Sequence, residues 1–254
     1  MMHNAFSTLI LAHVVLGAVA LCSFWIPAFA PKRRGLHTRA GQVFAWTMMA
    51  TASLAGAASV LTLVAPLATH PEAAQTARSA LNLRLGSGLM LGYLASITFV
   101  AAFSGLRAIR LRGNHAAHRS PSEIIANVVA FGLAVAVLVA GIRYEAMLLI
   151  GLSVIGLIGV PGNLRFIFAT PKTPQDWLYQ HISSMLGAGI AAHTAFLIFG
   201  TNRLAPQLAS EPLVWLAPTL IGVPVTHWLI RKRRRQFAAR RAAVAGAANP
   251  QLAA

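Results

Sequence analysis

The sequence predicts an all-α protein, a polytopic membrane bundle of seven transmembrane helices. Hydrophobic residues make up 57% of the 254-residue chain and charged residues only 10%, whereas an average soluble domain is roughly 25% charged. Apolar runs of about 20 residues, enough to cross ~30 Å of hydrocarbon, recur along the chain. Basic residues gather in alternate connecting segments, as the positive-inside rule requires of a multi-pass protein.

Seven apolar runs are long enough to cross a membrane. They cover residues 5–30, 41–65, 83–106, 124–142, 146–169, 177–200 and 212–230. The fourth and fifth runs are separated only by Arg143, Tyr144 and Glu145, but one merged helix would be too long for a single crossing. Within the fifth run, Pro161 and Gly162 predict a kink or a break.

The distribution of charge predicts an N-terminus outside and a C-terminus in the cytoplasm, in a bacterial inner membrane. Residues 1–231 form the predicted transmembrane domain, and residues 232–254 a basic, disordered cytoplasmic tail. The net charge of +16 and the motif RKRRRQFAARR are typical of segments that contact anionic lipids at the cytoplasmic face. We therefore expect a lipid surface, and no nucleic acid, as the partner of the tail.

The sequence lacks the residues that several kinds of chemistry require. The single cysteine, Cys22, excludes an internal disulfide and a cysteine-based zinc site. No Asp, Glu or Lys falls in the middle third of a predicted span, so neither an acidic proton relay nor a Schiff-base lysine is expected there. Four histidines fall in termini or loops, where no special role is expected; these are His3, His70, His115 and His118.

The remaining histidines are the candidate ligands. His13 and His193 are each predicted about 11 Å below the outer surface, and His181 and His227 each about 6 Å from the inner surface. His37, in the first inner loop, is an alternative member of the inner level. Two levels of imidazoles are the pattern that two stacked b-type haems require. However, the twelve-residue step from His181 to His193 turns about 120° around a helix, so these two rings should face different neighbours.

Three functions are compatible with these residues. The leading hypothesis is a redox protein that transfers electrons, with histidines holding haem b or lining a quinone site. The second is a proton-coupled small-molecule transporter. The third is an accessory subunit without a cofactor, whose histidines only tie helices together and which works with a membrane-protein partner or as a homo-oligomer. The sequence does not decide whether the protein is an enzyme, nor which substrate it uses.

Four segments resemble a family of bacterial multi-pass membrane proteins described as domain of unknown function 2306. They are HVVLGAVAL from His13, KRRGLHTRAGQVF around His37, HISSMLGAGIAAHTAFLI from His181 and LVWLAPTLIGVP from Leu213. The resemblance implies a first-span histidine, a G-x-H-x-R-x-G turn and a histidine opening the penultimate span. His193 and His227 lie outside this pattern.

The matching turn runs from Gly35 to Gly41 and contains His37 and Arg39. Its glycines allow a tight fold at the membrane surface. Arg39 is a candidate ligand for a lipid phosphate, a haem propionate or a quinone carbonyl, or else a solvated cation of the inner loop. The resemblance also raises a competing geometry, a single site built from His13, His37 and His181.

Overall fold

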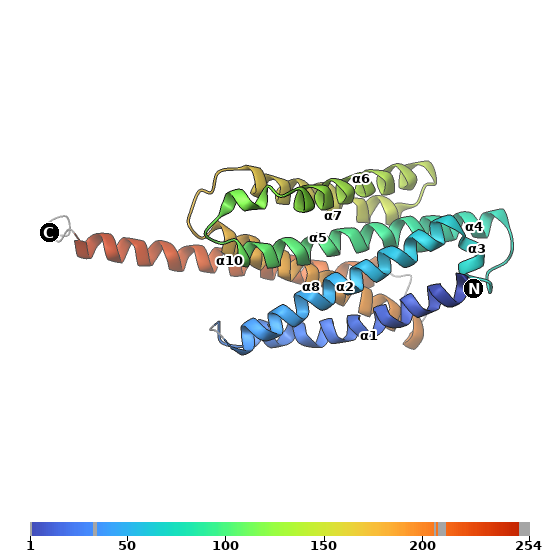
Figure 1. The fold of residues 1–254 in the computed structure, drawn as a ribbon, viewed down its shortest axis with the longest axis horizontal. Coiled ribbons are helices and arrows are strands. Elements are labelled where there is room, and N and C mark those ends of the chain that lie inside the picture. Colours follow the sequence, from blue (N-terminus) through green and yellow to red (C-terminus); the bar gives the residue numbers. More distant parts are fainter. Residues whose placement is uncertain (1, 33–34, 206, 208–211, 249–254) are drawn as a thin grey trace.

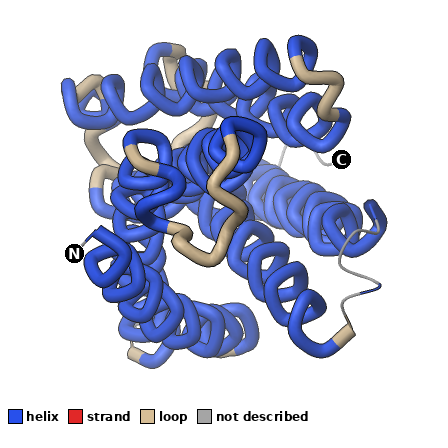
Figure 2. Tube along the Cα trace, turned by 90° about the vertical axis from the view of Figure 1, so that its right-hand side faces the viewer, coloured by secondary structure: helices blue, strands red, loops and turns tan. Residues whose placement is uncertain are grey.

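The computed structural model describes residues 2–32, 35–205, 207 and 212–248. Within these residues the chain forms helices and loops without strands, as the tube in Figure 2 shows. Seven of the described helical segments are long and apolar enough to cross a membrane. The predicted all-helical fold and the seven spans are therefore confirmed.

The long helices follow the predicted runs closely. They are α1 (Met2–Phe29), α2 (Leu36–Val64), α5 (Leu91–Arg110), α6 (Pro121–Arg143), α7 (Met147–Phe168), α8 (Asp176–Leu204) and α10 (Pro212–Ala248). Four short elements join them: α3 (Pro66–Thr69), α4 (Ala77–Leu83), the π-helix η1 (Arg84–Met90) and the 3₁₀-helix η2 (His115–His118). The third span starts at Ala77, because α4 and η1 continue into α5.

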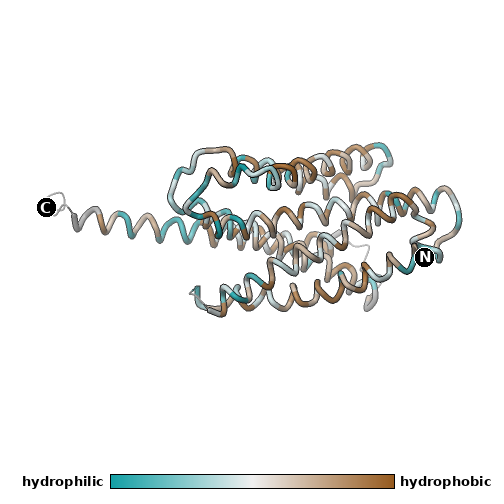
Figure 3. Tube along the Cα trace, viewed as in Figure 1, coloured by the Kyte–Doolittle hydropathy of each residue, from teal (hydrophilic) through white to brown (hydrophobic). Residues whose placement is uncertain are grey.

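Three apolar clusters hold the described bundle together, and two of them are the larger. The first joins α1, α2, α5 and α8, with Ala20, Phe44 and Ala188 among its members, and the second joins α5, α6 and α7 around Tyr93. Large apolar side chains on the outer faces, such as Leu11 and Ile158, remain exposed. Figure 3 shows apolar residues along the middle of the bundle and hydrophilic ones at its ends, as expected of a chain surrounded by lipid.

Several loops and the last part of α10 share one end of the bundle, on the left of Figure 1. We call it the basic end. It comprises the α1–α2, α5–α6 and α7–α8 connections and α10 beyond Ile230. Arg33 and Arg34 of the first connection lie outside the described residues. That the basic end faces the cytoplasm stays a prediction from the charge distribution.

One local prediction is wrong, and another is narrowed. The tail was expected to be disordered from residue 232, but α10 continues as a helix through Ala248, in keeping with the strong helix propensity of its many Ala and Arg residues. Of the kink or break predicted at Pro161, the break is absent, because α7 runs through this position without interruption. By contrast, the two helices on either side of residues 144–146 are separate, as predicted.

Candidate functional site

The two histidines predicted at the outer level do not converge. His13 donates from Nδ1 to the carbonyl oxygen of Thr51 on α2, at 2.9 Å. The ring of His193 instead packs against Phe24 and Trp25, with centroid distances of 5.2 and 5.1 Å. These two aromatic residues follow His13 by about three helical turns along α1. The predicted pairing of His13 with His193 at one depth is therefore wrong.

The position of α8 explains this difference. The first turn of α8 reaches the basic end, where Trp177 contacts Arg112 and Tyr179 contacts Arg234. The helix is thus displaced toward that end relative to α1, and His193 is displaced with it. The predicted rotation is confirmed, because His181 faces α5 whereas His193 faces α1.

The inner pair is also rearranged. His227 is exposed and bonds only to the Val223 carbonyl of its own helix, so it does not share the interior with His181. His181 donates from Nδ1 to the Gly105 carbonyl at 2.8 Å, and His37 donates to the Pro27 carbonyl at 3.0 Å. His37 follows the α1–α2 connection and His181 lies near the start of α8, so both are toward the basic end. His37, named as the alternative, therefore lies at the same end of the bundle as His181.

These two hydrogen bonds determine where each ring carries its proton. A carbonyl oxygen can only accept, so Nδ1 must be the donor in both His37 and His181. In the neutral ring this leaves Nε2 with a lone pair. Arg39, two residues after His37, is exposed. The described residues contain no group of three or more His, Cys, Asp or Glu side chains that would hold a metal ion.

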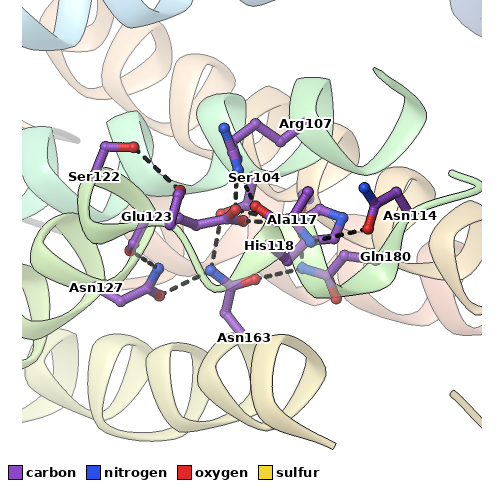
Figure 4. A network of polar contacts seen from close by, with 12 residues as sticks. Ser104, Arg107, Asn114, Ala117, His118, Ser122, Glu123, Asn127, Asn163 and Gln180 are labelled. Carbon is purple, nitrogen blue, oxygen red and sulfur yellow. Dashed lines mark hydrogen bonds and ion pairs between the residues drawn. The ribbon is translucent and has the colours of Figure 1, made fainter. Parts of the chain in front are cut away.

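The most concentrated polar cluster is one that sequence reasoning missed. The carboxylate of Glu123 is fully buried and accepts from Arg107 Nε at 2.6 Å. Its Oε2 atom also lies 3.1 Å from Nδ1 of His118, a residue only 1% exposed. Figure 4 shows the three side chains meeting beneath the loop between α5 and α6. We call Arg107, His118 and Glu123 the charged centre.

A chain of polar groups extends from the charged centre into the bundle. The Asn127 side chain donates to the Glu123 carbonyl, and Asn163 donates to the side-chain oxygen of Asn127 at 2.8 Å. Gln180 then donates to Asn163 at 2.6 Å. These contacts join α6, α7 and α8. Asn163 also donates a hydrogen bond to the Ser104 hydroxyl, which connects α5 to the same network. Four helices therefore share one buried polar network at the basic end.

Local sequence positions each member of the charged centre. The side chain of Asn114 accepts from the backbone N–H of Ala117 and so starts the 3₁₀ turn that ends at His118. Pro121 occupies the beginning of α6, where its missing N–H costs nothing. Glu123 then falls in the first turn, where the helix dipole favours an anion. Arg107 Nη2 donates to the Ala117 carbonyl at 2.6 Å, which fastens the loop to α5.

His115 and His118, for which the sequence predicts no special role, are half-buried and fully buried in the structure. Their rings lie 5.7 Å apart, both contact Phe166, and the Nε2 atom of each is buried without a hydrogen-bond partner in the described structure. A loop position therefore did not mean exposure to solvent. One signal was available: Glu123 is one of only five acidic residues, and it directly follows Pro121 and Ser122 at a predicted helix start.

No family model, curated protein or solved structure matches the chain. The resemblance to domain of unknown function 2306 thus stays a prediction. What the fold defines is the class of protein, a multi-pass helical membrane protein. Any finer statement rests on the charged centre and the histidines described above.

Proposed function

We propose that this protein is a proton-coupled transporter of the bacterial inner membrane and that the charged centre is its proton-binding site. One observation carries the proposal. Glu123 has no exposed surface, yet it is held between a guanidinium and an imidazole inside a bundle with a lipid-facing exterior. Ionisable residues buried among membrane helices are costly and typically belong to ion or substrate pathways.

The arrangement favours proton exchange at one pair of atoms. Nδ1 of His118 and Oε2 of Glu123 are 3.1 Å apart, so either group can hold a proton that lies between them. When Glu123 is ionised, Arg107 balances its charge. When Glu123 takes up a proton, that ion pair weakens and Arg107 becomes available to an anionic or polar solute. The amide network of Asn127, Asn163 and Gln180 then offers donors and acceptors to a solute between four helices.

Proton uptake by reconstituted vesicles tests this function. Liposomes containing the full chain and a pH-sensitive dye are supplied with a set of small anionic and polar solutes and given an inside-negative potassium diffusion potential with valinomycin. We expect the lumen to acidify faster than in protein-free vesicles. Replacing Glu123 by Gln keeps the side-chain volume and removes the acid, so acidification should fall to the protein-free rate.

Glu72→Gln is the matched control, because Glu72 is an exposed acid at the opposite end of the bundle. It should acidify like the unmodified protein. Circular dichroism and gel filtration establish that the Glu123→Gln variant remains folded. Uptake that persists in Glu123→Gln, or no uptake by the unmodified protein, would reject the proposal.

Electron transfer through haem b is the second candidate function. The observation that favours it is that His37 on α2 and His181 on α8 each have Nδ1 bound to a backbone carbonyl, both toward the basic end. Such second bonds orient imidazole ligands and leave Nε2 for iron. These two residues would hold the haem, and bound haem would supply a one-electron couple. A quinone near Arg39 is the corresponding partner.

Visible spectroscopy tests this candidate. The full chain is incubated with haem in detergent and passed over a desalting column. If His37 and His181 hold the iron, the protein retains a Soret band and gains a reduced α-band with dithionite, and His181→Ala removes both. His227→Ala, at an exposed position, should leave the spectrum unchanged. A colourless protein, or equal loss in both variants, contradicts the assignment.

A further inference from the structure

An apolar groove runs along the outside of the bundle between α2 and α5. Its first part, about 440 Å³, begins at the basic end beside Trp46, Arg107 and Arg110. A second part of about 440 Å³ continues toward the other end, past Gly56. Ser53 and Phe99 line both parts, so the two parts adjoin at these side chains, and α6 adds Ala126, Val129 and Leu133 to the wall of the second part.

The groove has the dimensions of a lipid chain. From Trp46 to Leu63, its extreme positions along α2, the helix rises about 26 Å. One leaflet contributes about 15 Å, half of the ~30 Å hydrocarbon layer. An acyl chain that starts at the level of Trp46 would therefore fit within the groove.

The charge at the two ends of the groove differs. Arg107 and Arg110 line it at the basic end, and none of its other lining residues is charged. The guanidinium of Arg107 is already engaged with Glu123 and Ala117. Arg110 is exposed, and its recorded contact in the described chain is with the Trp46 ring, 5.3 Å from the centroid. The guanidinium of Arg110, at the mouth of the groove (its basic end), is thus available to bind an anion.

We infer that this groove binds one anionic phospholipid, with its phosphate on Arg110 and an acyl chain along α2 and α5. A phosphate accepts paired hydrogen bonds from a guanidinium, and the carbon-lined walls suit a hydrocarbon chain. A quinone or an apolar helix of another protein would leave the cationic mouth without a counter-charge, and a zwitterionic lipid would bring a second cation, its trimethylammonium group, close to Arg110 and Arg107. The inference goes beyond the proposed transport function and does not depend on it.

Native mass spectrometry of the full chain in detergent, titrated with phosphatidylglycerol or phosphatidylcholine, tests the inference. We expect one phosphatidylglycerol to bind more tightly than phosphatidylcholine. Arg110→Gln should weaken phosphatidylglycerol binding by about tenfold, the effect of losing a charged hydrogen bond. Arg112→Gln is the matched control, because Arg112 also lies over a tryptophan but does not line the groove.

A second variant tests the chain-binding part. A side chain at Gly56 would meet open space, so Gly56→Leu fills the groove without disturbing the helices and should weaken binding of both lipids. Gly151→Leu, also in open space but on α7, should have no effect. Equal binding of the two lipids, equal loss in Arg110→Gln and Arg112→Gln, or full binding by Gly56→Leu would each overturn the inference. Because no proton flux is measured, these outcomes are independent of the transport test.

Discussion

At the scale of single residues, the interior contains a charge arrangement that is costly unless every partner is present. Glu123 is fully buried, and the Arg107 side chain is 21% exposed. The free-energy cost of removing a carboxylate from water is compensated only when the opposite charge and the hydrogen bonds are in place. The charged centre therefore contributes little net stability as a unit, but breaking it should be expensive. Such a pattern is expected of a site retained for function.

We predict that Arg107→Leu lowers the free energy of unfolding by about 3–5 kcal/mol, because Glu123 is left buried without its guanidinium. The double variant Arg107→Leu/Glu123→Leu should recover most of this loss, because it removes both charges. Thermal unfolding in detergent, followed by circular dichroism, measures the two effects. Arg110→Leu, which removes an exposed arginine of the same helix, is the control and should change stability little. A double variant as unstable as the single one would contradict this account.

At the scale of elements, close approach between helices depends on particular glycines. The Tyr93 ring of α5 is fully buried against α7, where its hydroxyl donates to the Leu152 carbonyl at 2.9 Å and accepts from the Gly156 N–H at 2.8 Å. A Cβ at Gly156 would lie 2.8 Å from this ring. The contact also lies just beyond the π-helical segment η1, a type of irregularity often found near functional sites.

Gly156→Ala should therefore destabilise the protein by about 1–3 kcal/mol, the usual cost of overpacking a core. On the same helix, a Cβ at Gly159 would meet open space. Gly159→Ala should be neutral or slightly stabilising, since Ala has the higher helix propensity. Unfolding midpoints of the two variants in the same detergent check the difference. Equal midpoints would show that the Tyr93 ring moves aside at no cost.

At the scale of the whole molecule, the basic end is a layer of interacting segments. Beyond the bundle, α10 continues as the cationic helix visible in Figure 1, and its Arg234 and Arg241 contact Tyr179 and Gln175, at the start of α8. Partial burial of Lys32, together with the nearby Arg233 guanidinium, lowers the pKa of the Lys32 amine. The charged centre and the mouth of the proposed lipid groove lie at this same end, joined by Arg107.

Hydropathy and charge in the sequence were enough to determine the helical class, the seven spans and the clustering of cations at one end, because these depend on local composition and on the thickness of a bilayer. Only the tertiary structure decided which polar groups meet. The position of α8 along its neighbours follows from contacts such as Gly189 against Phe24 and Gly105 against Met185, and no local pattern encodes such a displacement. For that physical reason, His13 and His193 lie apart, while Glu123, an acid at a helix start, belongs to a polar network that joins four helices at the basic end.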